Sequence, residues 1–259
     1  MPVALSLENK VALITGGSRG IGAAIVRMFV QAGARVLFNY EKAKAAAESL
    51  SRECGAENCV PIQCSLNTPA AAQSLVGACL QRFGRIDILV ANHGIWPDED
   101  LPIDRMPDEH WRRTMSINLD AVFGLIKHSV AEMKKTAGST SPAHIVLISS
   151  TSGQRGEAFH VDYSATKGAI ISMTKGLSTE LAPHHIYVNC VAPGWVDTDM
   201  CHPTLDDPEK AKKIFGTIPL GRVGGPEEIA GPVLFLCTPY AAFITGEVFN
   251  VNGGAVLVG

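Results

Sequence analysis

The stretch VALITGGSRGIG, residues 11–22, decides the fold because it joins a short apolar run directly to a glycine-rich turn. The run is expected to form a buried strand, and a helix is expected from Ile21 onward. Gly16 would make the turn, Gly20 would let the backbone approach a ligand, and Gly22 would permit close helix packing. The start of a helix offers free N–H groups and a positive dipole end to an anion. The stretch therefore predicts a pyrophosphate-binding loop, with a glycine spacing that differs from GxGxxG.

The same alternation of strand and helix continues along the chain. Five more apolar runs predict strands, at Val36 to Tyr40, Ile86 to Ala91, His144 to Ser149, Tyr187 to Ala192 and Val248 to Val251. A weaker run, Cys59 to Cys64, contains Pro61, which a central strand would not tolerate. Helices are predicted at Ile21 to Gln31, Lys42 to Glu53, Pro69 to Arg82, Pro107 to Lys135, Asp162 to Leu181 and Pro226 to Leu236. Crossover connections of this kind produce parallel sheets. The prediction is a single α/β domain over residues 1–259, a Rossmann-type doubly wound parallel sheet of about seven strands with helices on both faces.

One irregular stretch, Asp197 to Val223, interrupts this alternation. It contains Pro203, Pro208 and Pro219, with a short charged helix between them. A plain surface excursion is the alternative, but the stretch follows a predicted strand at the edge where ligands bind. It is therefore interpreted as a substrate lid at about 197–223.

Composition narrows the class of protein. Hydrophobic residues make up 46% and charged residues 18% of the chain, which is typical of a globular protein with a large core. The net charge is -3 and basic residues are scattered, so no nucleic-acid partner is predicted. Residues 1–10 do not resemble a secretory signal, and no run has membrane-spanning length, so we expect a cytoplasmic protein without a membrane partner. The seven cysteines are interpreted as reduced thiols, and no metal site is predicted.

The end of the second predicted strand bears on the choice of cofactor. An acidic residue there would bind the ribose hydroxyls of NAD, but the strand ends in Asn39 and Tyr40. Arg19 and Lys42 could neutralise a ribose phosphate, so NADP(H) is favoured over NAD(H), although both could be ordinary solvated charges. Glu41 would repel a phosphate unless its side chain points away.

A proton-transfer group is predicted from Tyr163 and Lys167. Their spacing of four places both side chains on one face of a helix. An ammonium beside a phenol favours the phenolate, which would bring the tyrosine closer to working at neutral pH. Such a pair also arises by chance. Ser150 strengthens the interpretation because it ends a predicted strand at the carboxyl edge, where ligands of open parallel sheets bind.

These motifs together resemble the short-chain dehydrogenase/reductase family over nearly the whole chain. Residues 15–22 match its TGxxxGxG motif, residues 92–94 its NAG motif, and residues 163–167 its YxxxK motif. Pro193-Gly194 and the terminal Asn252-Gly253-Gly254 also fit. The resemblance implies hydride transfer between a nicotinamide and a small-molecule carbonyl or secondary alcohol.

The resemblance also assigns roles to residues. Ser150 would hydrogen-bond the substrate oxygen, Tyr163 would exchange the proton, and Lys167 would bind the nicotinamide ribose and tune Tyr163. Asn118 would hold a water for proton relay, whereas an asparagine in an apolar helix is otherwise a packing residue. The expected cofactor-binding residues are Gly16, Ser18, Arg19, Gly20, Ile21, Gly22, Asn39, Tyr40, Lys42, Ser65, Leu66, Asn92, Gly94, Tyr163, Lys167, Pro193, Gly194, Val196 and Thr198.

The chain departs from the family pattern at Ser65 and at His93. Ser65 stands where the family often has an aspartate that contacts adenine, so that contact is absent or made by a hydroxyl. His93 stands where a small residue is usual, and it is expected to pack rather than to narrow the site.

The sequence predicts the type of reaction more narrowly than it predicts the substrate. The chain is most similar to 3-oxoacyl-[acyl-carrier-protein] reductases, yet His184 replaces a usual arginine and the loop from Thr136 to Ala143 is longer, which puts carrier-protein docking in question. A general ketone, secondary-alcohol or sugar dehydrogenase is the alternative. A non-catalytic nucleotide sensor is a rival of another class, which the complete tetrad disfavours. The expected pocket residues are Trp96, Phe159, His160, Trp195 and Met200.

A homotetramer is also expected from the resemblance. The long helices from Pro107 to Lys135 and from Asp162 to Leu181 would pack against partner subunits. Ala121 to Val130 is more apolar than one sheet face requires, and the tail from Ala255 to Gly259 would otherwise be exposed.

Overall fold

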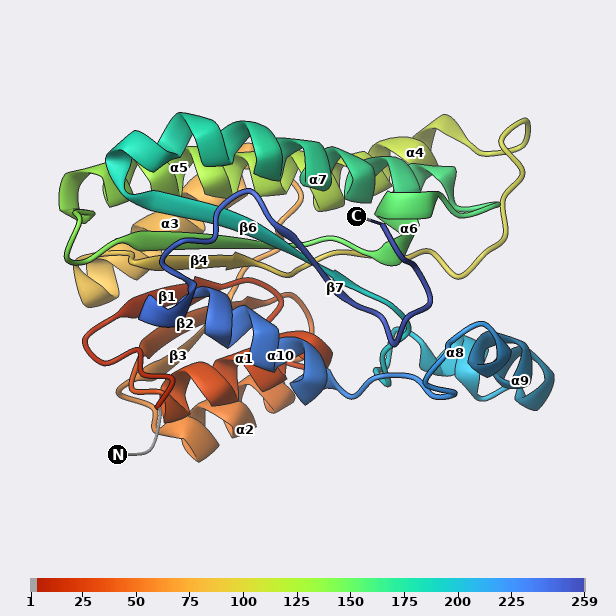
Figure 1. Ribbon diagram of the computed structural model, residues 1–259, viewed down its shortest axis with the longest axis horizontal. Helices are drawn as coiled ribbons and strands as arrows, with labels where there is room; N and C mark the ends of the chain where they lie inside the picture. Colours follow the sequence, from red (N-terminus) through yellow and green to blue (C-terminus); the bar gives the residue numbers. More distant parts are fainter. Residues whose placement is uncertain (1–3, 259) are drawn as a thin grey trace.

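The computed structural model describes residues 4–258, which form a seven-stranded sheet between two layers of helices (Figure 1). The strands are β1 (Val11–Ile14), β2 (Arg35–Tyr40), β3 (Cys59–Gln63), β4 (Ile88–Ala91), β5 (Ala143–Ile148), β6 (Ile186–Pro193) and β7 (Val248–Val251). All neighbours pair in parallel, in the order β3-β2-β1-β4-β5-β6-β7. The predicted doubly wound fold is confirmed. Its order reverses between β1 and β4, which places a ligand crevice at their carboxyl ends.

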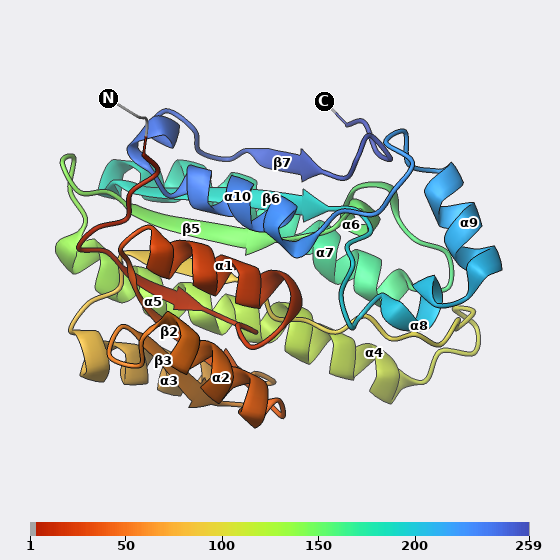
Figure 2. The same cartoon turned by 90° about the horizontal axis from the view of Figure 1, so that it is seen from below.

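The helices divide between the two faces of the sheet. On one face lie α1 (Gly20–Gln31), α2 (Lys44–Cys54) and α10 (Pro226–Leu236). On the other lie α3 (Pro69–Phe83), α4 (Asp108–Met115), α5 (Ala121–Thr136) and α7 (Val161–Leu181) (Figures 1 and 2). Each face buries its own apolar cluster, and Phe29 and Phe38 are fully buried in the first. The central strands are covered on both sides, which explains their uninterrupted apolar sequence.

Three local features differ from the simple sequence pattern. The expected helix from Pro107 to Lys135 is two α-helices joined by a π-helical turn, η1 (Ser116–Asp120). A short helix that was not predicted, α6 (Thr151–Arg155), follows β5. The weakly predicted strand β3 does form. It lies at the sheet edge and pairs only with β2, so Pro61 can occupy it although proline has no N–H group for a further strand.

The irregular segment 197–223 extends beyond the carboxyl ends of the strands (Figure 2). It carries α8 (His202–Leu205) and α9 (Pro208–Gly216). Its base is held by two backbone bonds, from Asp197 N to the Gly224 carbonyl and from Gly224 N to the Trp195 carbonyl, each 2.9 Å long. The segment is thus anchored at both ends beside the ligand edge. Among residues 4–258, no helix is long and apolar enough to cross a membrane.

Candidate active site

A cavity of about 970 Å³ lies at the carboxyl edge of the sheet. The glycine loop, the ends of the central strands and the start of segment 197–223 line it. All the expected cofactor-binding residues line this cavity, namely Gly16, Ser18, Arg19, Gly20, Ile21, Gly22, Asn39, Tyr40, Lys42, Ser65, Leu66, Asn92, Gly94, Tyr163, Lys167, Pro193, Gly194, Val196 and Thr198. Ser150 lines it too. The structure therefore brings together residues that lie far apart in sequence.

The glycine loop leaves room that a side chain would fill. Gly16 and Gly20 have φ angles of 65° and 52°, a left-handed conformation that other residues rarely adopt. A Cβ atom on Gly22 would lie 2.0 Å from the Gly16 carbonyl oxygen. Helix α1 begins at Gly20, so its free N–H groups face the cavity end that these glycines form. The loop has the form of an anion cradle.

Two asparagines hold this loop in place. The Asn39 side chain accepts from Gly16 N at 2.9 Å and donates to the Cys64 carbonyl at 2.9 Å. The Asn92 side chain donates to the carbonyls of Thr15 and Gly16, at 3.0 and 3.3 Å. Both residues were expected to contact a cofactor directly. Their amide groups also hold the turn, and both residues line the cavity, so the expected cofactor contact stays a prediction.

The predicted proton-transfer residues meet at the other end of the cavity. Ser150 is the N-cap of α6, and its hydroxyl accepts from Ser152 N at 3.1 Å. Tyr163 lies in the first turn of α7 and Lys167 one turn later. The Lys167 Nζ atom donates to the Ile148 carbonyl at 2.9 Å and lies 5.6 Å from the centre of the Tyr163 ring. The three side chains are thus fixed by the ends of β5 and α7.

Burial dominates the electrostatics of these groups. It raises the pKa of Tyr163, and the Ser150 hydroxyl acts in the opposite direction. Burial lowers the pKa of Lys167 to about 8. The expected lowering of the Tyr163 pKa by Lys167 is not found, because loss of solvent raises the pKa of Tyr163. Tyr163 is protonated at neutral pH, which suits a proton donor to a carbonyl oxygen.

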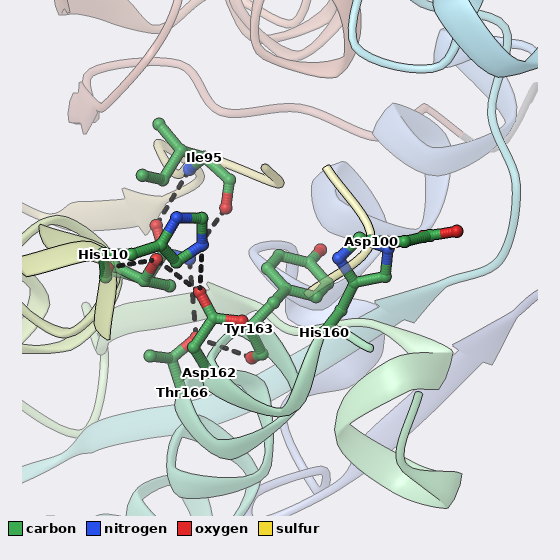
Figure 3. A network of polar contacts seen from close by, with 9 residues as sticks. Ile95, Asp100, His110, His160, Asp162, Tyr163 and Thr166 are labelled. Atoms are coloured by element: carbon green, nitrogen blue, oxygen red, sulfur yellow. Dashed lines mark hydrogen bonds and ion pairs between the residues drawn. The ribbon is translucent and has the colours of Figure 1, made fainter. Parts of the chain in front are cut away.

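Asn118 lies behind the cavity wall and does not line it. Its side chain is fully buried in the π-helical turn. It accepts from Ile95 N at 2.8 Å and donates to the Ile95 carbonyl at 2.9 Å, two of the bonds drawn around Ile95 in Figure 3. Asn118 therefore fixes the segment after β4 that forms part of the wall.

His93 packs as expected. Its Nδ1 atom lies 2.8 Å from the Thr15 hydroxyl, and its Nε2 atom lies 3.1 Å from the Ile117 carbonyl. Burial lowers the pKa of His93 to about 4, so the ring is neutral at physiological pH. Nε2–H must then donate to Ile117, because a carbonyl only accepts, and the Thr15 hydroxyl donates to Nδ1. The ring also lines part of the cavity.

The adenosine end carries both signs of charge. Arg19 forms an exposed ion pair with Asp199 at 3.3 Å. The Glu41 carboxylate accepts from the Ser65 hydroxyl at 3.3 Å and lines the cavity, so it does not point away from a bound phosphate. Lys42 lines the cavity beside it. The charge of Glu41 therefore opposes the binding of a ribose phosphate, whereas the charges of Arg19 and Lys42 favour it.

Two expected pocket residues are placed differently. Trp96, Trp195 and Met200 line the cavity, but Phe159 and His160 do not. His160 is buried behind Trp96, with ring centres 4.8 Å apart, and its Nε2 lies 3.2 Å from an Asp100 carboxylate oxygen (Figure 3). The turn at Phe159, whose φ is 66°, directs that side chain to solvent.

His184, which replaces a usual arginine, lies outside the lining of the cavity. It follows the last turn of α7, whereas Tyr163 lies in the first turn. A helix of 21 residues is about 30 Å long, so within one chain His184 is remote from the reacting groups.

Sequence reasoning missed several residues that line the cavity. Most belong to loops whose course no motif specifies: Ala43, Cys64, Asn67, Ile95, Arg113, Ser116, Ile117, Ile148, Ser149, Thr151, Ser152, Arg155, Glu157, Asp199 and Cys201. The carboxylate of Glu157 is chemically the most notable, and its position between Ser150 and Tyr163 in sequence was the available signal.

Comparisons with known proteins define the class. A family model described as enoyl-(acyl carrier protein) reductase matches residues 16–256. A Brucella melitensis structure titled short-chain dehydrogenase/reductase, glucose/ribitol dehydrogenase, is 35% identical, with a TM-score of 0.89, and covers 99% of this chain and 100% of its own. The chain belongs to the short-chain dehydrogenase/reductase family and is an oxidoreductase.

Particular relatives narrow the similarity. The 3-oxoacyl-[acyl-carrier-protein] reductase FabG of Salmonella typhimurium is 39% identical over 98% of this chain and 100% of its own. A Pseudomonas aeruginosa RhlG/NADP active-site complex is 33% identical, with a TM-score of 0.90, and covers 99% and 100%. A 3-ketoacyl-(acyl-carrier-protein) reductase from Brucella melitensis, complexed with NADH, is 31% identical, with a TM-score of 0.88, and covers 97% and 100%.

Proposed function

We propose that this protein is an NADP(H)-dependent oxidoreductase that transfers hydride between nicotinamide and a substrate carbonyl or secondary alcohol, with 3-oxoacyl thioesters as the first substrate class to test. The observation that carries the proposal is the convergence of Ser150, Tyr163 and Lys167 in one cavity whose other end is the glycine loop. The similarity to 3-oxoacyl reductases supports the thioester. A general ketone, secondary-alcohol or sugar dehydrogenase is the second candidate, supported by the similarity to a structure described as a glucose/ribitol dehydrogenase.

The cavity fits a dinucleotide. The space above Gly16, Gly20 and Gly22 accommodates a pyrophosphate, and the cavity volume suits a cofactor with a substrate. The bound nicotinamide supplies or accepts the hydride. One of the similar structures is described as a complex with NADP, and another as a complex with NADH. Arg19 and Lys42 support NADP(H), and Glu41 makes that preference a narrow one.

The protein residues place the substrate and move a proton. The Ser150 hydroxyl hydrogen-bonds the substrate oxygen, and the protonated Tyr163 hydroxyl donates a proton to that oxygen as the carbonyl is reduced. The Lys167 ammonium binds the nicotinamide ribose and stabilises the phenolate that remains. Asn118 positions the Ile95 segment and contributes to proton relay. Tyr163 recovers its proton from solvent through this relay.

The wider expectations belong to the same proposal. Segment 197–223 acts as a lid over the bound substrate, the active form is a homotetramer, and the protein acts in the cytoplasm on a small molecule. A docked carrier protein is not part of this proposal, because His184 replaces an arginine that is usual at a docking position.

The test is oxidation of NADPH and NADH by the pure protein with acetoacetyl thioesters and a ketone panel. We expect NADPH-dependent thioester reduction that falls by about a hundredfold or more in Tyr163→Phe, because general acid catalysis is lost. Tyr187→Phe is the matched control, because Tyr187 meets His144 edge to face and does not line the cavity. Activity on other ketones alone would favour the general reductase. Cofactor binding without any turnover would favour the alternative that the protein is a non-catalytic nucleotide sensor.

A further inference from the structure

Glu157 is a carboxylate in the substrate half of the cavity that the proposed reaction does not use. It lies in the loop between α6 and α7, is half-buried, and lines the cavity together with Ser150, Tyr163 and Trp195. In the described part of the chain, its carboxylate takes part in no ion pair and no side-chain hydrogen bond. An unpaired charge that faces a binding cavity is available to a ligand.

The loop that carries Glu157 is held by backbone hydrogen bonds and by a buried ring. His160 N donates to the Glu157 carbonyl at 3.3 Å, and Leu101 N donates to the Phe159 carbonyl at 3.2 Å. The buried His160 ring packs on Trp96, and its Nε2 lies 3.2 Å from Asp100 (Figure 3). These contacts fix the course of the backbone at Glu157, so the fold places this residue on the cavity wall.

The surroundings strengthen the effect of this charge. Trp96 and Trp195 meet edge to face, with ring centres 6.0 Å apart, and form an aromatic wall of the same cavity. Apolar walls lower the local dielectric and so extend the field of a charge. The Glu157 carboxylate adds to the rise in the Tyr163 pKa, so its field reaches the reacting hydroxyl. Arg155 also lines the cavity, but its side chain is exposed and no ion pair within residues 4–258 joins it to Glu157.

We infer that Glu157 is a specificity-determining residue. It favours carbonyl substrates in which the group one methylene away from the reacting carbonyl is neutral or donates a hydrogen bond, and it disfavours substrates with a carboxylate at that position. This inference rests on the proposed function, because it concerns the substrate of that same site. It assigns 3-oxo esters, 3-oxo thioesters and hydroxyketones to the preferred class and free 3-oxo acids to the excluded one. A carboxylate substrate would have to approach Glu157 against like-charge repulsion.

The experiment compares three small ketones with NADPH: methyl acetoacetate, acetoacetate and 4-hydroxy-2-butanone. The first two have nearly the same shape and differ by one charge. We expect the wild type to prefer the ester to the anion by at least about tenfold in kcat/KM. Glu157→Gln is expected to reduce that ratio by about tenfold, chiefly by improving acetoacetate, and to weaken the hydroxyketone.

Glu99→Gln is the matched control, because it removes the same charge from a nearby exposed position outside the cavity lining. It should leave the ratio unchanged, and NADPH binding by all three proteins should confirm that the variants fold. A wild-type ratio near one, or a ratio that Glu157→Gln does not move, would overturn the inference while leaving the proposed function intact. Failure of the wild type to reduce any ketone or thioester would overturn the proposed function, and this inference with it.

Discussion

His93 shows how one side chain can link the nucleotide loop to the helix behind the reacting groups. It bridges Thr15, at the end of β1, and Ile117, in the π-helical turn beside Asn118. A π-helical turn leaves carbonyl groups without their usual helical partners, and the neutral imidazole satisfies one of them. The histidine that interrupts the expected NAG motif is therefore a structural bridge in this chain.

His93 should give the protein a measurable dependence of stability on pH. Its folded pKa is about 4, below the ordinary 6.5, so between these values the unfolded state binds more protons. The stabilisation is complete above 6.5 and is lost as the pH falls towards 4. We expect His93→Ala to lower the free energy of unfolding by about 1–3 kcal/mol at neutral pH. The difference should shrink in acid, as followed by urea denaturation.

His184→Ala is the control for this prediction, because His184 is exposed at the end of α7. His144, whose pKa burial also lowers to about 4, is present in all the proteins and cancels from the comparison. A difference between wild type and His93→Ala that stays constant with pH would contradict the bridge.

At the scale of elements, the close approach of the glycine loop to helix α1 is the most demanding packing in the site. A methyl group on Gly22 would lie 2.0 Å from the Gly16 carbonyl oxygen, which backbone constraints prevent from moving freely. We expect Gly22→Ala to lower the free energy of unfolding by about 3 kcal/mol or more, and to weaken NADPH binding. Gly77→Ala in α3 is the control, with nothing within 4 Å of the new methyl. It should stabilise the helix by up to about 1 kcal/mol. Equal melting temperatures for the two variants would refute this account.

The strands and helices could be predicted because their patterns are local. Runs such as Val36 to Tyr40 are apolar throughout since the sheet is covered on both faces, and the glycine loop fixes where the first helix begins. The π-helical turn could not be predicted, because Met115 to Ala121 keeps ordinary helical backbone angles at its ends and contains no breaker. Its cause is tertiary, since Asn118 and Ile117 bond to Ile95 and His93.

The site residues likewise fall into those that local sequence patterns predict and those that depend on contacts between distant segments. Ser150, Tyr163 and Lys167 could be predicted because strand ends and helical spacing place them. The position of Glu157 depends on a loop whose turn requires Phe159 in a left-handed conformation, which its sequence does not favour. The engagement of Asn39 with the glycine loop is likewise a contact between distant segments. Motifs thus predicted which of these residues would meet in one cavity, while the contacts that support them came only from the three-dimensional structure.

At the scale of the whole molecule, α4, α5 and α7 form one layer on the same face of the sheet (Figure 1), and each of these helices carries an exposed large apolar side chain. Trp111, Phe123 and Val161 are 37%, 50% and 39% exposed. Each comes from a different one of these three helices, which lie on the same face of the sheet. Exposed apolar surface of this kind marks interaction sites in soluble proteins. The face thus supports the expected contact between subunits of a homotetramer.

A charge placed on this face should break the assembly. We expect the wild type to sediment as a tetramer and Phe123→Glu to sediment as smaller species, because a carboxylate would be buried without a partner in the interface. Phe215→Glu in α9 is the control, with a side chain 38% exposed on the projecting segment rather than on the helical layer. Sedimentation velocity of the three proteins decides between the possibilities. A monomeric wild type would contradict the homotetramer, and a Phe123→Glu protein that stays tetrameric would place the interface elsewhere, where the exposed Phe243 and Leu257 are the next surface to test.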